Sequence, residues 1–408
     1  MTLTLTRRRL MQSGTVLAGA LAAPAVLRAA NTVRIGGLTP NTGGGGTFGP
    51  NIAAAHRKVV KTANQAGGVL GREVVLVQED SETNPETAIR AARKLVDADG
   101  VSAIIGTFSS SVTLGIMPLC QDAGVIQMCT SSASEIPVQD KRNLVFDFQP
   151  LSPAWGKAIA SLADARGLGE FAIMGLNNDF TGSMVTSFAR QVRALGGTVV
   201  NEPFYYNGGQ SSYRSEVSQL IAGDPQAVFV PGYVPDFTAV YKELFRQGYT
   251  GQVITISIAT AGAFKKVVGD AADGVLHGFP VPPIESPAYK NYLRFVAVEP
   301  DGTVQHPFGS AGFDQINTIL LAAEAAGTTE TGPLRDGVFQ IANHPGGVSV
   351  STLEEGLKAL RAGEVINYTG ASSACDFQEN GMLKSRDFML YEIRNGEDVP
   401  IKRITSEA

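Results

Sequence analysis

The sequence of residues 102–128 is SAIIGTFSSSVTLGIMPLCQDAGVIQM, and its pattern decides the fold. Residues 102–105 and 125–128 are short apolar runs rich in isoleucine and valine, which predicts two buried strands. Apolar residues recur at helical spacing from Val112 to Gln121, which predicts a helix between the strands. A strand, a helix and a second strand in this order form a parallel pair with a right-handed crossover.

The same alternation of strands and helices extends over the rest of the chain. Upstream, strands are predicted at 33–38 and 73–78, and helices at 51–65 and 85–98. After residues 146–150 the pattern starts again, with strands at 171–174, 199–205, 227–230 and 253–256 and helices at 184–195, 213–221 and 236–247. A proline-rich stretch at 279–283 interrupts it, residues 286–360 are predicted mainly helical, and 376–377 and 388–393 are predicted as strands. The fold class is therefore α/β with two wound parallel sheets.

Composition limits the function classes. The chain has 408 residues, of which 44% are hydrophobic and 17% charged, so it can bury the cores of two domains and is not a disordered protein. Its net charge of −5 makes nucleic acid an unfavourable partner. The three cysteines are too few for a disulfide scaffold, and we expect all three to be small buried hydrophobic residues. They are Cys120, Cys129 and Cys375.

Residues 1–30 have the pattern of an export signal. Arg7, Arg8 and Arg9 precede an apolar run from Ser13 to Leu27, and small residues follow. The run is shorter than the roughly twenty residues that span a bilayer. A charged start, a short apolar middle and a small-residue end predict a signal peptide, and the paired arginines indicate twin-arginine export to the periplasm. An uncleaved membrane anchor is the alternative.

Known catalytic and cofactor motifs find little support. Residues 44–49 fit G-x-G-x-x-G, but the first glycine comes well after the strand, and the candidate acids Glu79 and Asp80 lie beyond the expected spacing of about twenty residues. We expect a flexible loop over a cleft there, with a cofactor-bearing oxidoreductase as the alternative. A serine hydrolase using one of residues 109–111 stays open on spacing alone. The histidines show no metal-ligand spacing and are expected at the surface or in loops. They are His56, His277, His306 and His344.

An ordered set of segments carries a family resemblance. The segments are GGVLGR at 67–72, VLVQED at 75–80, IGTFSSS at 105–111, TSSASE at 130–135, NDFTG at 178–182, GYVPD at 232–236, GDAADGV at 269–275 and DFQENG at 376–381. In this order the sequence resembles type I solute-binding proteins of branched-chain amino acid ABC transporters. The resemblance covers nearly the whole chain after the signal.

The resemblance implies a type I periplasmic binding protein fold, in which three crossovers join two wound lobes around an interlobe cleft. We place lobe 1 at 31–148 plus 282–367 and lobe 2 at 149–281 plus 368–408. The ligand is expected in the cleft, because wound sheets bind ligands beyond the carboxyl ends of their strands.

The resemblance also implies which residues bind the ligand. Ser109 follows a strand and opens a helix, where backbone N–H groups and hydroxyls suit a carboxylate or carbonyl oxygen, although N-capping is the alternative. Thr130 and Ser132 match a second wall, and Tyr233 matches a tyrosine that closes on the ligand. Asp179 and Asp236 are expected to cap helices. The remaining predicted ligand-binding residues are Thr107, Phe108, Phe180, Phe48, Ser257, Phe308 and Trp155.

The implied function is capture of a small ligand by hinge closure for an ABC permease in the inner membrane, without catalysis, cofactor or metal. Amino-acid binders of the family hold the ligand ammonium with an acid, and Ser257 occupies that position here. We therefore expect a carboxylate- or amide-bearing ligand without a charged amine, with an aromatic ligand as one option. The alternatives are a branched-chain amino acid binding protein and a ligand-sensing receptor module. A monomer is expected.

Overall fold

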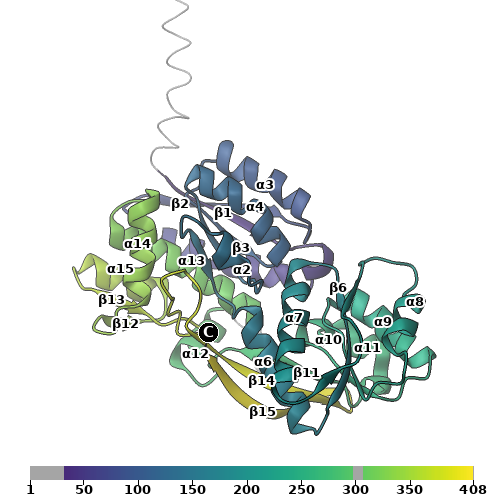
Figure 1. The fold of residues 1–408 in the computed structure, drawn as a ribbon. Helices are drawn as coiled ribbons and strands as arrows, with labels where there is room; N and C mark the ends of the chain where they lie inside the picture. The colour runs from purple at the N-terminus through teal and green to yellow at the C-terminus, as the bar shows by residue number, and fades with distance from the viewer. Residues whose placement is uncertain (1–31, 297–306, 408) are drawn as a thin grey trace, which may run out of the picture.

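Two lobes make up the chain in the computed structural model, which describes residues 32–296 and 307–407 (Figure 1). In Figure 1 the elements up to β5 gather with α13, α14 and α15 in lobe 1, and α6 to β11 gather with β14 and β15 in lobe 2. The type I periplasmic binding protein fold predicted from the sequence is confirmed. The predicted export signal at 1–30 lies outside the described residues, as does His306.

Lobe 1 is built on a five-stranded, wholly parallel sheet in the order β2-β1-β3-β4-β5. Its strands are β1 (Thr32–Thr39), β2 (Glu73–Asp80), β3 (Ala103–Thr107), β4 (Ile126–Cys129) and β5 (Val145–Asp147). Its helices are η1 (Gly43–Gly45), α2 (Gly49–Gln65), α3 (Pro85–Asp97), α4 (Ser110–Ala123), α5 (Ile136–Gln139), α12 (Pro287–Val296), α13 (Pro307–Ala326), α14 (Thr331–Ala342) and α15 (Leu353–Arg361). One buried core lies under α2 and α13, and another lies under α3 and α4.

Lobe 2 is built on a larger mixed sheet in the order β15-β14-β11-β10-β9-β6-β7, with β8 paired to β6. Its strands are β6 (Glu170–Leu176), β7 (Thr198–Val199), β8 (Phe204–Tyr206), β9 (Ala227–Phe229), β10 (Gln252–Ile254), β11 (Leu276–Val281), β14 (Ser385–Arg394) and β15 (Glu397–Glu407). β14 and β15 are antiparallel, so this edge departs from the parallel winding.

The strand predicted at 199–205 is interrupted. Asn201 accepts a hydrogen bond from the N–H of Ile173 (2.8 Å) and donates one to its carbonyl oxygen (3.0 Å), which replaces backbone pairing at this point. Pro203 follows and has no N–H to donate to a ladder. The single predicted strand is therefore two short ones, β7 and β8.

The helices of lobe 2 pack closely on its sheet and on each other. They are α6 (Ser152–Ala165), α7 (Asp179–Ala194), α8 (Arg214–Leu220), α9 (Val234–Arg246), α10 (Ser257–Thr260), α11 (Ala263–Val268) and η2 (Gly269–Ala272). A Cβ on Gly156 of α6 would lie 2.6 Å from the backbone of Ser187 in α7, so the close approach of these helices requires glycine.

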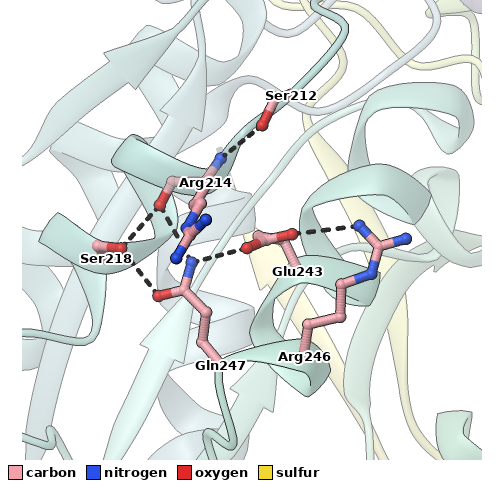
Figure 2. A network of polar contacts seen from close by, with 6 residues as sticks. All are labelled: Ser212, Arg214, Ser218, Glu243, Arg246 and Gln247. Atoms are coloured by element: carbon pink, nitrogen blue, oxygen red, sulfur yellow. Dashed lines mark hydrogen bonds and ion pairs between the residues drawn. The ribbon is translucent and has the colours of Figure 1, made fainter.

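A polar network fixes α8 against α9 on the outside of lobe 2 (Figure 2). Gln247 Nε2 donates to the Arg214 carbonyl oxygen (3.1 Å) and to Glu243 (2.9 Å), and Ser218 Oγ donates to Gln247 Oε1 (2.9 Å). Glu243 also pairs with Arg246 at 3.2 Å. These contacts join the C-terminal part of α9 to α8.

The third crossover begins later than the predicted boundary at residue 368. Asp314 of α13 accepts hydrogen bonds from the Tyr368 hydroxyl (2.8 Å), the Ala371 N–H (2.8 Å) and the Ser372 N–H (2.7 Å). Phe377 packs on Phe146 and Phe148 of the first lobe. Residues 371–383 therefore pack in the core of lobe 1, next to the short parallel pair β12 (Val348–Val350) and β13 (Ile366–Tyr368).

The prediction for the histidines is wrong at two positions. His56 and His277 have no exposed surface, whereas His344 lies in a loop and is half-buried. Burial, with a smaller contribution from Arg57, lowers the pKa of His56 to about 3, so the ring is neutral. The cysteine prediction is confirmed, because all three are buried and free, and burial raises the pKa of each thiol.

Candidate functional site

A cleft of about 940 Å³ lies between the two lobes. Lobe 1 contributes Ser109 and Ser111 from the start of α4, and lobe 2 contributes Asp179 and Tyr233 from the starts of α7 and α9. These four positions follow the carboxyl ends of parallel strands, which is where wound sheets bind ligands. The cleft therefore lies where the sequence places it.

Tyr233 also lines a second, smaller cavity, the inner pocket. Its free volume is about 10 Å³, room for about one water molecule, so a larger ligand requires the lobes to separate or side chains to turn. The lining residues are Phe108, Thr130, Ser132, Gln149, Trp155, Phe180, Tyr233, Ile258 and Phe308. Seven of the predicted ligand-binding residues thus share one pocket.

Aromatic rings from both lobes fill the space around the inner pocket. Phe108 and Phe308 belong to lobe 1, and their ring centroids lie 4.9 Å apart. The ring centroid of Phe108 lies 5.9 Å from that of Tyr233, which belongs to lobe 2. Tyr233 stacks on Phe180 at 6.2 Å, and Phe48 packs edge-on against Phe308 at 4.9 Å. Rings at these separations attract one another beyond simple burial. The two lobes therefore meet through a continuous aromatic cluster.

The three serines that open α4 have different roles. Ser109 is the N-cap residue, but its side chain makes no cap bond, and Ser109 lines the cleft together with Tyr233 of the other lobe. Burial raises the pKa of Tyr233 to about 12, and the nearby Ser109 hydroxyl lowers it slightly. Ser110 Oγ accepts from the N–H groups of Ser132 and Ala133 and so holds the second wall in place. Ser109 and Ser111 line the cleft, whereas Ser110 does not.

Ser111 and its neighbours hold the lobes together at the rim. Ser111 Oγ accepts from the Asp179 N–H at 3.2 Å. Ser183 Oγ accepts from the Ser134 N–H at 3.2 Å and donates to Glu135 at 2.9 Å. These hydrogen bonds join the two lobes across the rim of the cleft.

The second wall is tied to the first helix of lobe 2. Trp155 Nε1 donates to Ser132 Oγ and to the Pro150 carbonyl oxygen, both at 3.1 Å, which fixes the indole plane beside the pocket. Thr130 Oγ1 lies 3.5 Å from the Thr107 carbonyl oxygen. Thr107 itself does not line either cavity, because its hydroxyl accepts from Thr113 inside lobe 1. Thr107 therefore supports the wall from behind.

Ser257 turns away from the inner pocket. Its hydroxyl lies 2.7 Å from His277 Nδ1, and His277 Nε2 lies 3.0 Å from Asp398, which also pairs with Lys265 at 2.9 Å. Ile258, the next residue, lines the pocket instead. The polar chain from Ser257 to Asp398 fastens α10 to the edge strands of lobe 2.

The helix-cap prediction for the two aspartates is wrong. Asn178 is the N-cap of α7 and accepts from the Thr181 N–H, and Asp179 follows it with its carboxylate in the cleft lining. Asp236 lies in the first turn of α9, where its Oδ1 accepts from the Gly209 N–H and the Tyr213 hydroxyl. Asp179 is thus an acid at the cleft entrance.

Sequence reasoning missed Gln149, a buried residue of the inner pocket. No known motif contains it, and its position directly before Pro150, where the chain was expected to cross between the lobes, was the available signal. The carboxylate of Asp147 accepts from the N–H groups of Gln149 (3.0 Å) and Ser131 (3.1 Å). Burial raises the pKa of this carboxyl group well above its usual range.

The sequence profile of the periplasmic binding protein family matches residues 32–397. This chain belongs to that family. The binding protein is 26% identical over 372 residues to the leucine-, isoleucine-, valine-, threonine- and alanine-binding protein of Pseudomonas aeruginosa, covering 89% of this chain and 90% of that one. Its relatives are solute-binding proteins, so it is a binding protein and not an enzyme.

Solved structures show the same fold. A leucine-binding protein from Thermotoga maritima superposes with a TM-score of 0.76 at 22% identity, covering 91% of the binding protein and 98% of that chain. A solute-binding protein from Rhodopseudomonas palustris in complex with benzoate superposes with a TM-score of 0.71 at 17% identity, covering 91% and 96%.

The glycine-rich segment at 43–46 lies over the cleft of the binding protein. A Cβ on Gly44 would lie 2.6 Å from Tyr233, and one on Gly45 would lie 2.9 Å from Phe108. Among the described residues, no helix has the length and apolar character of a membrane span, and no group of side chains is arranged to hold a metal ion.

Proposed function

We propose that the protein is the solute-binding component of an ABC transporter and captures a small planar ligand that bears a carboxylate or an amide. The observation that carries this proposal is the inner pocket. Its lining consists of aromatic, hydroxyl and amide side chains with one isoleucine, and it contains no acid or base among the described residues. A buried ammonium without a carboxylate partner would be unfavourable there.

The ring contacts favour a planar ligand. Phe108, Phe180 and Trp155 present faces and edges to the small space between them, and flat rings of this kind accept another ring at about the same separations. The benzoate complex of a structural relative is consistent with such a ligand in this fold. An oxygen of the ligand would accept hydrogen bonds at the start of α4, beside Ser109.

Closure of the lobes is the proposed mechanism. Ser109 and Tyr233 come from different lobes, and so do Ser111 and Asp179, so these contacts form only when the cleft closes. A ligand that touches both walls binds the closed form more tightly and shifts the population toward it. Export through the twin-arginine signal at 1–30 would place this monomeric receptor in the periplasm, where a permease of the inner membrane receives the ligand.

A branched-chain amino acid is the second candidate. Its support is the acidic cleft entrance, where Asp179 lies with Glu135 and Asp236, together with the amino acids named for the Pseudomonas aeruginosa relative. In this case Asp179 would take the place of the missing acid at Ser257 and would pair with the ligand ammonium.

A binding panel separates the two candidates. Benzoate, benzamide, short aliphatic acids and amides, leucine, isoleucine and valine are each added to the protein, and the midpoint of thermal unfolding is measured. A ligand present at about a hundred times its Kd adds roughly 2.7 kcal/mol of stability. Stabilisation by an acid or amide supports the proposal, and stabilisation by the three amino acids alone would replace it with the second candidate.

A further inference from the structure

Gln149 occupies a fixed position at the first crossover between the lobes. Its N–H donates to Asp147 Oδ1 at 3.0 Å, and the following residue is Pro150, which restricts the backbone before it. The carbonyl oxygen of Pro150 accepts from Trp155 Nε1 at 3.1 Å. The backbone that carries the Gln149 side chain is therefore held on both sides.

The side chain of Gln149 is 1% exposed and lines the inner pocket, yet neither Oε1 nor Nε2 has a hydrogen-bond partner among the described residues. Two hydroxyl groups of the pocket lining, by contrast, have partners. Ser132 Oγ accepts from Trp155 Nε1, and Thr130 Oγ1 lies 3.5 Å from the Thr107 carbonyl oxygen. An unpaired buried amide is costly, and such groups in native proteins usually have a partner that binds them.

We propose that Gln149 is a specificity-determining residue that selects a carboxamide or lactam over the corresponding carboxylate, an inference that rests on the proposed function. A carboxamide presents an acceptor and a donor side by side, so it pairs with both ends of the Gln149 amide. A carboxylate presents acceptors only, so it satisfies Nε2 and places a negative oxygen beside Oε1. Sites built to pair a polar group discriminate strongly against ligands that lack it.

The surroundings of Gln149 fit the rest of such a ligand. Trp155 and Phe308 line the same pocket, so the group attached to the carboxamide would contact aromatic surface. No charged side chain in the pocket lining, among the described residues, would compensate a carboxylate at this depth. An uncharged amide avoids the desolvation penalty that a buried anion incurs there.

Matched pairs of ligands test the proposal. Benzamide against benzoate and nicotinamide against nicotinate are titrated calorimetrically into the wild-type protein, Gln149→Met and Gln149→Leu. Gln315→Met is the matched control, because Gln315 is an equally buried glutamine in α13 of lobe 1 that lines neither cavity. We expect the wild-type protein to bind each amide at least about tenfold more tightly than its acid.

The variants should lose about tenfold or more in affinity for the amides and change less than about threefold for the acids, and the control should bind both classes as the wild type does. The midpoint of thermal unfolding without ligand should stay the same or rise in Gln149→Met, because an unpaired buried amide is removed. A purely structural role, such as holding one water molecule, would instead lower the midpoint and leave the amide-to-acid ratio unchanged.

Two results overturn the inference in distinguishable ways. A wild-type protein that binds benzoate more tightly than benzamide leaves the proposed function in place and refutes the role of Gln149. A wild-type protein that binds leucine and no ring compound refutes the proposed ligand class and, with it, the selection of amides.

Discussion

Gly44→Ala should weaken ligand binding without destabilising the unliganded protein. The added Cβ would lie 2.6 Å from Tyr233 Cδ2, much closer than the 3.4–4 Å of ordinary contacts. The tyrosine ring has little freedom to move, because it is buried and lies between Phe108 (5.9 Å) and Phe180 (6.2 Å). Overpacking of this kind costs about 1–3 kcal/mol. Gly44 and Tyr233 belong to different lobes, so the cost falls on the closed form.

Only closure is penalised, so the apparent Kd should rise by about 5- to 150-fold. Calorimetric titration with the tightest compound of the panel measures this change. Gly332→Ala in α14 is the control, since its Cβ would meet no atom within 4 Å. The radius of gyration from small-angle scattering should fall on ligand addition in the control and fall less in Gly44→Ala. Equal affinities in the two variants would show that Gly44 does not approach Tyr233 when the ligand binds.

Two further substitutions and one labelling experiment test the site and the cores. Ser109→Ala should raise the Kd about ten- to hundredfold, because the proposed hydrogen bond between the Ser109 hydroxyl and the ligand is lost. Calorimetric titration checks this, with Tyr233→Phe as a comparison. His56→Gln should remove the acid sensitivity that His56 causes. The pKa of His56 is about 3 in the folded protein and 6.5 in the unfolded protein. Its contribution to the free energy of unfolding is therefore complete above pH 6.5 and is lost as the pH falls toward 3. Wild type should lose about 2 kcal/mol of unfolding free energy between pH 7.5 and 5 relative to the variant, measured by urea denaturation. Native thiols should resist alkylation until the protein unfolds, and mass spectrometry would detect earlier labelling of Cys120, Cys129 or Cys375.

The order of strands and helices could be predicted from apolar periodicity. The exposed edge strand of lobe 2 and the interruption of the strand predicted at 199–205 could not. β15 was missed because residues 397–407 include five charged side chains and Pro400, a composition typical of an exposed edge strand. Pro400 faces the register shift after Leu390 of β14. The burial of His56 was detectable in principle, because it shares the helical face of Ile52 and Val59 in α2.

The resemblance predicted which aromatic residues surround the pocket, since strand ends of a known fold meet at one edge. It could not predict side-chain direction within short elements. Ser257 is the first residue of the four-residue helix α10. A shift of one residue in the helix changes which side chain faces the pocket, and in the structure it is Ile258 that lines it. Gln149 carries no motif, and its importance depends on what surrounds its amide in three dimensions.

The inner pocket links ligand choice to lobe closure. In the proposed mechanism, closure without ligand buries apolar rings of both lobes, which favours the closed form. It also leaves the buried Gln149 amide without a partner, which opposes closure. A ligand that pairs with Gln149 removes the cost of the unpartnered amide and keeps the gain from burying the apolar rings. The free energy gained at this residue therefore appears only in the closed, liganded state, which is the condition for a ligand to drive the change. If Gln149 acts in this way, Gln149→Met should bind amides weakly and also close more readily without them, and small-angle scattering of the unliganded variant should give a smaller radius of gyration than that of wild type.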